Sequence, residues 1–314
     1  MEQVDNHSPK PEQTSPKEFF SKSLANRTRA SDIDLDGSNV AYWCYEPVTT
    51  TPATRTILVI HGFRGDHHGL LRVVDHLPEM RVIMPDLPGF GSSEPFAGDP
   101  HTVERFGKFI TGFMAALELG PDTVLLGHSF GSIIASHFAA ANPGAIRPLI
   151  LVNPIAAPAL EGPKGIMTKL AVFYYQASAK LPRRLGLALL RSRLIVRIMS
   201  AAMAKTRGKE LRAFVHGQHD AYFSAFADRA SLLESFRASV SSYVGEVAGQ
   251  LDLPVLLVAG EKDEIALLRD QHKLMELLPD GALEVIPGVG HLIHYETPAP
   301  AAAAIRRFLE EHPA

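Results

Sequence analysis

The sequence predicts an α/β protein with a mostly parallel central sheet, helices on both faces of that sheet, and an inserted all-helical cap. Short runs of continuously apolar residues, typical of strands buried on both faces, alternate along the chain with amphipathic helical patterns. Within residues 155–245 the pattern is helical only, and strands return at Pro254. These features favour one large α/β domain that carries a helical insertion.

Most elements can be placed from the hydrophobic pattern. Alternating apolar and polar residues at 31–46 predict a β-hairpin with one wet face. Apolar spacing predicts helices at 102–119, from Ser129 through 142, and at 298–311. Uninterrupted apolar and β-branched runs predict buried strands at 56–60, 81–85, 124–128, 148–152, 254–260 and 283–286.

The chain divides into three parts by composition. Residues 1–28, rich in polar residues and proline, are expected to form a disordered tail. The α/β core takes residues 29–154 and 246–314, and the cap takes residues 155–245. A helical insertion between two strands of a parallel sheet is typical of a lid over an active site. Breaks between the cap helices are expected at Pro163, Pro182 and Gly186.

Composition excludes several classes of protein. A formal charge of −3 over 314 residues argues against a nucleic-acid binder. The single cysteine, Cys44, rules out a disulfide framework and favours a reducing compartment. The N-terminus lacks the apolar core of a secretory signal, and no apolar run is long enough to span a membrane. We therefore expect a cytoplasmic protein.

A G-x-S-x-G motif stands at the centre of the predicted sheet. The apolar run 124–128 ends at Ser129, and an Ala-rich segment with helical character follows at once. Gly127 and Gly131 remove the Cβ atoms that would collide in so tight a turn, and His128 completes the motif. This strand-turn-helix context predicts that Ser129 is a nucleophile.

An acid and a base follow in the chain order that such a serine requires. Asp263 lies on the loop after the strand at 254–260, and its neighbours Glu261 and Glu264 are alternative acids. His291 follows the last strand on a glycine-containing loop and is the expected base, with His294 as the alternative.

Backbone donors for an oxyanion are expected beside the serine. His61 and Gly62 follow the strand at 56–60, and Gly62 lets the chain turn so that the N–H group of Phe63 can serve as one donor. Phe130, directly after the serine, supplies the other. Asp86, after the strand at 81–85, is interpreted as a residue that fixes its own loop through backbone N–H groups.

Other polar and aromatic clusters are given non-catalytic interpretations. His67 and His68 are assigned to a solvated loop, with a substrate or metal contact as the alternative. The group His216, His219 and Asp220 lacks further ligands at recognisable spacing, so we expect no metal and no organic cofactor. Four aromatic residues are expected in the cap core or the pocket: Phe214, Tyr222, Phe223 and Phe226.

The cap carries a concentrated positive charge. Residues 162–212 contain twelve Lys or Arg residues and one acid, Glu210, interleaved with apolar residues. A basic amphipathic segment of this kind is typical of a weak attraction to an anionic membrane or an anionic substrate. The alternative interpretation is a solvated outer face of the cap helices.

Five motifs in order resemble the α/β-hydrolase superfamily over residues 31–312, closest to its capped serine esterase and lipase branch. They are residues 60–63 (Ile-His-Gly-Phe), 86–92 (Asp-Leu-Pro-Gly-Phe-Gly-Ser), 127–131 (Gly-His-Ser-Phe-Gly), 260–263 (Gly-Glu-Lys-Asp) and 290–291 (Gly-His). The serine at 129 departs from the aspartate that epoxide hydrolases and haloalkane dehalogenases of this superfamily use. The resemblance thus implies serine chemistry.

The expected function is hydrolysis of a carboxylic ester or thioester with a small to medium apolar acyl group, through an acyl-enzyme on Ser129. One alternative is a carbon–carbon bond hydrolase acting on a vinylogous diketone, although the residues after His61 and Ser129 depart from that group's pattern. The other alternative is a ligand-binding protein without catalysis. The expected partner is a small ester-like molecule, and the sequence leaves the oligomeric state open.

Overall fold

An eight-stranded sheet forms the centre of the protein. The structure is a computed structural model that describes residues 19–51, 54–158 and 165–313. The strand order is β1-β2-β4-β3-β5-β6-β7-β8; β2 is antiparallel to both β1 and β4, and the other pairs are parallel. The strands are β1 (Thr28–Leu35), β2 (Ser38–Tyr45), β3 (Thr56–Ile60), β4 (Arg81–Pro85), β5 (Val124–His128), β6 (Leu149–Val152), β7 (Val255–Gly260) and β8 (Gly281–Ile286).

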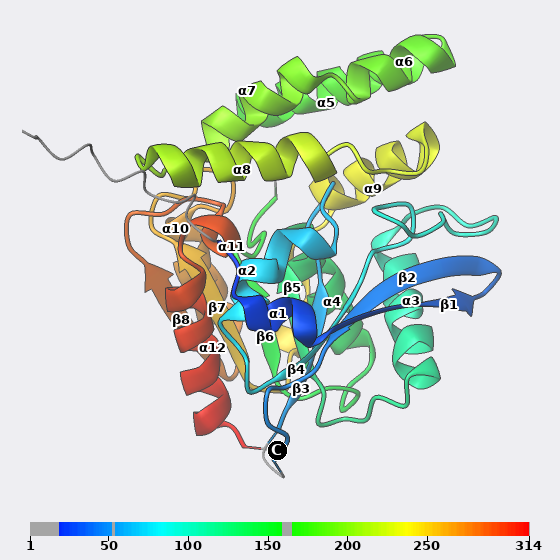
Figure 1. Ribbon diagram of the computed structural model, residues 1–314. Coiled ribbons are helices and arrows are strands. Elements are labelled where there is room, and N and C mark those ends of the chain that lie inside the picture. Colours follow the sequence, from blue (N-terminus) through cyan, green and yellow to red (C-terminus); the bar gives the residue numbers. More distant parts are fainter. Residues whose placement is uncertain (1–18, 52–53, 159–164, 314) are drawn as a thin grey trace, which may run out of the picture.

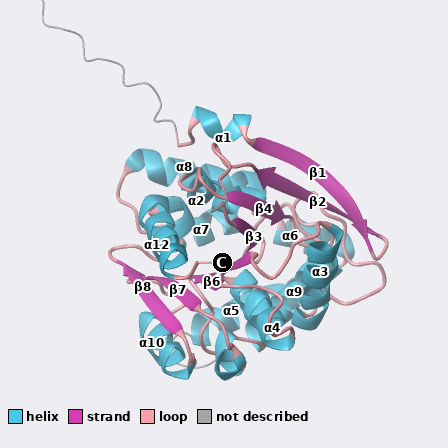
Figure 2. Ribbon diagram, turned by 90° about the horizontal axis from the view of Figure 1, so that it is seen from below, coloured by secondary structure: helices cyan, strands magenta, loops and turns pink. Residues whose placement is uncertain are grey.

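Helices cover both faces of this sheet, so the predicted fold class is confirmed. Side chains of β5 alternate between two apolar clusters: Leu125 packs toward α3, α4 and α10, whereas Val124 and Leu126 pack toward α2 and α12 (Figure 2). The core helices are α1 (Lys22–Asn26), α2 (Leu71–Asp75), α3 (Val103–Ala116), α4 (Phe130–Ala141), α10 (Leu268–Leu277), α11 (Ile293–Glu296) and α12 (Pro298–Glu311), with 3₁₀ turns η1 (His67–Leu70), η2 (Val244–Glu246) and η3 (Ala248–Gln250).

Five helices between β6 and β7 form an insertion that packs over one end of the strands. Figure 1 shows α5, α6 and α7 as the outermost layer, with α8 between them and the core. Phe63, just beyond the end of β3, packs against Tyr175 of α5 and Phe236 of α9. The insertion therefore lies over the carboxyl ends of the parallel strands. Its helices are α5 (Gly165–Lys180), α6 (Arg183–Leu190), α7 (Arg193–Met203), α8 (Lys209–Tyr222) and α9 (Arg229–Ser241).

One of the expected breaks in the insertion is wrong. Pro182 does precede α6, and Pro163 lies outside the described residues, but Gly186 sits inside α6. A Cβ at Gly186 would lie 2.3 Å from the carbonyl oxygen of Ser178 in α5. This glycine therefore permits close packing of two helices and does not end one.

The N-terminal tail predicted for residues 1–28 is wrong for its last ten residues, and residues 1–18 lie outside the described part of the chain. Ser21 caps α1 by accepting a hydrogen bond from the N–H group of Leu24, and its hydroxyl donates to Asp75 at 2.5 Å. Leu24 is buried against the core. The N-terminal capping hydrogen bond of α1 and the hydrogen bond to Asp75, 54 residues away, hold this segment in place. Amino-acid composition predicts neither of these hydrogen bonds.

We predict that Gly131→Ala destabilises the fold by about 1–3 kcal/mol or more, because its Cβ would lie 2.1 Å from the carbonyl oxygen of Ile60. Gly112→Ala, in the middle of α3 with open space around the added Cβ, is the matched control and should stabilise by about 0.5–1 kcal/mol. Urea unfolding of both variants measures the difference. Equal effects of the two substitutions would contradict the tight contact between α4 and β3.

Candidate active site

Ser129 occupies a strained turn between β5 and α4. Its backbone has φ 53° and ψ −117°, a combination that residues other than glycine adopt only where surrounding contacts enforce it. A Cβ on Gly127 would lie 2.4 Å from the carbonyl oxygen of Gly131, so glycine at 127 lets the helix approach the strand. All five residues of β5 are buried, whereas Ser129 is partly exposed.

The structure brings Ser129, His291 and Asp263 into one hydrogen-bonded line. Nδ1 of His291 lies 2.8 Å from Oδ2 of Asp263, and Nε2 lies 2.8 Å from the hydroxyl oxygen of Ser129. A carboxylate can only accept, so Nδ1 carries the proton and Nε2 accepts from the hydroxyl group. Ser129 follows β5, Asp263 follows β7 and His291 follows β8, so the sheet fixes all three.

Asp263 is held as a buried carboxylate. It is 4% exposed and accepts hydrogen bonds from the N–H groups of Ile265 and Ala266 and from Nδ2 of Asn153, at 2.7 to 2.9 Å. Burial raises the pKa of Asp263, but its electrostatic interaction and hydrogen bond with His291 and the hydrogen bonds from Ala266 and Ile265 outweigh burial, so the net pKa lies below the usual value. The charged carboxylate therefore orients His291.

The alternative acids and base lie elsewhere. Glu261 accepts from the N–H group of Gly288, and Glu264 is exposed and pairs with Lys205. His294 is buried, with its ring 4.3 Å from the ring of His128, and burial lowers its pKa well below the usual value. Among the described residues, neither Glu261 nor His294 has a hydrogen bond to Ser129 or His291.

The loop after β3 passes directly beside the serine. A Cβ on Gly62 would lie 3.2 Å from the Cβ of Ser129 and 3.0 Å from the ring of His128. Within the described chain, the backbone N–H groups of Phe63 and Phe130 have no hydrogen-bond acceptor. These two N–H groups are thus available to an oxygen atom beside Ser129.

His61 fixes this loop in the neutral state. Its Nε2 accepts from the N–H group of Leu87, so Nδ1 carries the proton and donates to the carbonyl oxygen of Gly62 at 2.8 Å. Burial lowers the pKa of His61, which keeps the ring uncharged. Asp86 accepts from the N–H groups of His67 and Ser92, which confirms its predicted loop-fixing role.

Two polar residues of this region were missed by the sequence interpretation. Asn153, which follows β6 and carries no charge, donates a hydrogen bond from its amide to Asp263. Arg64 is 1% exposed and donates to the carbonyl oxygens of Phe223 and Leu190 and to the hydroxyl group of Tyr175. The sequence places Arg64 directly after Phe63, next to the expected oxyanion donor. Its hydrogen-bond partners could not be predicted, because they lie more than 100 residues away in the chain.

The remaining histidines form hydrogen bonds and ring contacts within the protein. His67 is buried and donates to Asp86, so the solvated-loop interpretation is wrong for it; His68 stacks on Tyr222. Ligand atoms of Asp66, His67 and His68 lie within 4.8 Å of one another, which is close enough for these three side chains to hold a metal ion. His216 and His219 both contact the hydroxyl group of Ser200.

The aromatic residues expected in the cap divide between two places. Phe223 and Phe226 lie against the guanidinium group of Arg64. Phe214 packs on Tyr295 instead, and Tyr222 packs on His68. The first pair therefore lies close to the loop that carries Phe63.

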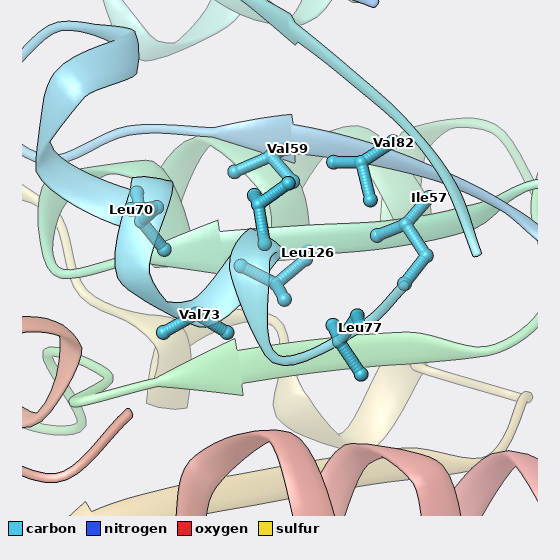
Figure 3. Close-up of a pocket in the computed structure, with 8 residues that line it drawn as sticks. Ile57, Val59, Leu70, Val73, Leu77, Val82 and Leu126 are labelled. Carbon is cyan, nitrogen blue, oxygen red and sulfur yellow. The ribbon is translucent and has the colours of Figure 1, made fainter. Parts of the chain in front are cut away.

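A small apolar void lies away from this site. It is enclosed by β3, β4, β5 and the segment from η1 to just beyond α2 (Figure 3). No polar side chain reaches it, so it is a packing gap and not a candidate active site. Its lining residues are Ile57, Val59, Leu70, Val73, Val74, Leu77, Val82 and Leu126.

Comparisons with known proteins agree with the fold. A family model described as the alpha/beta hydrolase fold matches residues 55–298. Lipase 3 of Moraxella sp. is 24% identical over 260 residues, covering 82% of this chain and 76% of that protein. A putative 2-succinyl-6-hydroxy-2,4-cyclohexadiene-1-carboxylate synthase of Bacillus subtilis is 26% identical over 271 residues, covering 82% and 91%. The structure of an esterase from Thermogutta terrifontis has a TM-score of 0.69 at 22% identity, covering 91% and 100%, which shows the fold alone.

We predict that acid weakens the fold from about pH 6.5 downward. Burial lowers the pKa of His128 to about 3 and that of His219 to about 4. Between these values and the unfolded pKa of about 6.5, the unfolded chain binds protons that the folded chain does not. Each such histidine therefore removes up to about 1.4 kcal/mol of stability per pH unit as the pH falls through that window.

His219→Gln should reduce this slope, whereas His272→Gln, at an exposed position of α10, should leave it unchanged. Urea unfolding at a series of pH values between about 4 and 7 measures both. An identical slope for the His219 variant and the unmodified protein would show that this ring is not held neutral.

Proposed function

Because the chain belongs to the alpha/beta hydrolase fold family, we propose that it is a serine hydrolase that cleaves a carboxylic ester or thioester. The single observation that carries this proposal is the hydrogen-bonded line from Ser129 through His291 to Asp263. A buried, charged carboxylate behind a neutral imidazole is the arrangement that makes a serine hydroxyl nucleophilic.

The proposed reaction uses these groups in turn. His291 Nε2 takes the hydroxyl proton as the Ser129 oxygen attacks the acyl carbon, and the N–H groups of Phe63 and Phe130 stabilise the oxyanion. His291 then gives the proton to the leaving alcohol or thiol, and an acyl group remains on Ser129. Water, deprotonated by His291, releases the acid and restores the serine. Asp263 stabilises the imidazolium in both steps.

An apolar acyl group fits the surroundings of the serine. Phe63 packs against Phe130, Tyr175 and Phe236, so aromatic side chains surround the loop that supplies one oxyanion donor. The nitrogen atoms of Arg64, a nearby buried cation, already donate to groups of the insertion. Arg64 is therefore committed elsewhere, which favours an uncharged ester over an anionic diketone substrate.

The helical insertion is proposed to act as a cap over this site. Tyr175 of α5 and Phe236 of α9 stack on each other at 3.9 Å, and both reach Phe63. The insertion thus supplies apolar surface directly above the candidate oxyanion loop and shields it from water. The acyl chain would lie between this surface and the core.

We predict that the protein hydrolyses p-nitrophenyl esters and that Ser129→Ala abolishes turnover at every acyl length. Loss of the nucleophile should reduce kcat by about 10⁴-fold or more, since the remaining binding groups supply little chemistry. Ser241→Ala, at the exposed end of α9, is the matched control and should keep full activity. Release of p-nitrophenolate measures both. A folded protein that is inactive on the whole series would overturn the ester proposal.

We also predict a split between two substitutions of Asn153, a positioning residue. Asn153→Asp places a second carboxylate against Asp263, favours protonated His291 and should lower kcat about 10- to 100-fold, most severely at acidic pH. Asn153→Gly tolerates the φ of 46° and removes only the amide, so its loss should be smaller and uniform over pH. Profiles of kcat/KM against pH separate the two. Matching profiles would show that Asn153 has no electrostatic role.

A further inference from the structure

Exposed apolar side chains are concentrated on the outer helices of the insertion. Of the nine large hydrophobic side chains that are exposed in the described chain, six lie between residues 170 and 198. Phe173 is 68% exposed and Leu194 is 70% exposed, so about two thirds of each residue's surface faces water. The six residues, called the outer face below, are Leu170, Phe173, Leu181, Leu185, Leu194 and Ile198.

Five residues of the outer face belong to α5, α6 and α7, and Leu181 lies in the connection between α5 and α6. α5 packs against α6 and α9, and α7 packs against α8. These three helices lie furthest from the C-terminal end of the chain in Figure 1. Leu194 and Ile198 are four residues apart, and Leu170 and Phe173 are three apart, so each pair lies on one side of its helix. Each pair therefore forms an exposed apolar stripe on its helix, whereas single scattered exposed residues would need no explanation.

Positive charge borders the same surface. Seven basic residues of α5 to α7 and their connections are exposed, and the sequence from 162 to 209 contains no acid. Among the described residues, Arg197 is the one of these seven with an ion pair, to Asp220 of α8. Arg193 and Arg197 lie beside Leu194 and Ile198, so a cationic row runs next to the apolar row. The seven residues are Lys169, Lys180, Arg183, Arg184, Arg191, Arg193 and Arg197.

We propose that the outer face binds the surface of an anionic lipid bilayer, with the axes of α5, α6 and α7 in the plane of the interface. Apolar side chains that enter the acyl boundary, together with cations that meet anionic headgroups, match the two chemical zones of such a surface. Nucleic acid would satisfy the cations but leave the leucine and phenylalanine side chains in water. No described helix is long and apolar enough to span a bilayer, so the contact is interfacial.

The binding surface lies directly above the candidate active site. In α5, Phe173 points to the outside, whereas Tyr175, two residues later, is buried and packs against Phe63. One helix thus connects the lipid-facing layer with the oxyanion loop. The inference extends the proposed function by placing acyl substrates of the membrane next to the cap, but binding itself does not depend on hydrolysis.

Vesicle sedimentation of the full chain tests the proposal, with phosphatidylcholine vesicles compared with equimolar phosphatidylcholine and phosphatidylglycerol vesicles. The protein should bind the anionic vesicles and be released from them at high salt.

Three combined substitutions, Arg183→Gln, Arg184→Gln and Arg193→Gln, should weaken binding to the anionic vesicles roughly 100-fold, since each cation contributes about fivefold. Phe173→Ser with Leu194→Ser should weaken it at least about 10-fold. Val48→Ser with Leu277→Ser, exposed apolar residues outside the outer face, is the matched control and should bind normally.

Hydrolysis of a water-soluble p-nitrophenyl ester, measured on the same variants, keeps the two proposals separate. All of these variants should retain the activity of the unmodified protein, because none alters the candidate site. The proposal is overturned if the unmodified protein does not bind anionic vesicles. It is also overturned if the triple arginine variant binds anionic vesicles as tightly as the unmodified protein does. Self-association that is lost in the Phe173 and Leu194 variant, without vesicle binding, would instead assign the outer face to a second copy of the chain.

Discussion

The close approach of α4 to β3 and β5 is the constraint on which the candidate site depends. The backbone at Ser129 has a positive φ, and it can persist only because the helix after it is pressed against two strands. Glycine at 127 and at 131 makes that contact possible, since a Cβ at either position would overlap backbone atoms. The same contact sets Gly62 and the N–H group of Phe63 beside the serine. One packing contact therefore positions both the hydroxyl group and a candidate oxyanion donor.

The electrostatics around His291 follow from which buried groups carry charge. Burial alone would favour a neutral Asp263, but two backbone N–H groups, Asn153 and His291 stabilise the carboxylate. The neighbouring rings of His128 and His294 have lowered pKa values and stay neutral. If either ring were charged, it would repel the imidazolium that the proposed mechanism forms on His291. In the proposed mechanism, His291 is therefore the ring of this cluster that gains a charge, while His128 and His294 stay neutral.

The sequence allowed the core of the fold to be predicted because its signals are local. The apolar runs that became β3, β4, β5, β6 and β7 lie within a residue or so of their expected positions, and the Gly-x-Ser-x-Gly turn needs only five neighbouring residues. Ser129, Asp263 and His291 could be selected because each follows a strand of a parallel sheet, whose carboxyl ends share one edge. Their catalytic roles remain proposals, but their proximity follows from topology.

Features that depend on distant partners could not be predicted. Residues 19–28 follow a polar, proline-rich stretch, but Phe19 and Phe20 pack on Phe214 and Ser21 is held by Asp75. His67 resembles a loop residue until β4 brings Asp86 against it, and Gly186 resembles a helix break until α5 packs across it. The role of Asn153 in the candidate site could not be predicted for the same reason. Its amide donates a hydrogen bond to the carboxylate of Asp263, which lies 110 residues away in the chain.

Arg64 joins the core to the insertion and limits how the two can separate. A fully buried guanidinium group is costly unless its donors are satisfied, and here the acceptors are carbonyl oxygens at Leu190 and Phe223 and the hydroxyl group of Tyr175. Lifting the insertion would break all of these hydrogen bonds together, and water would have to replace them. These hydrogen bonds therefore stabilise the observed packing of the insertion on the core, in which Tyr175 contacts Phe63. Because Arg64 directly follows Phe63 in the chain, any movement of these helices acts on the backbone that carries the candidate oxyanion donor. Arg64 in this way links the position of the insertion to the backbone at Phe63, the candidate oxyanion donor.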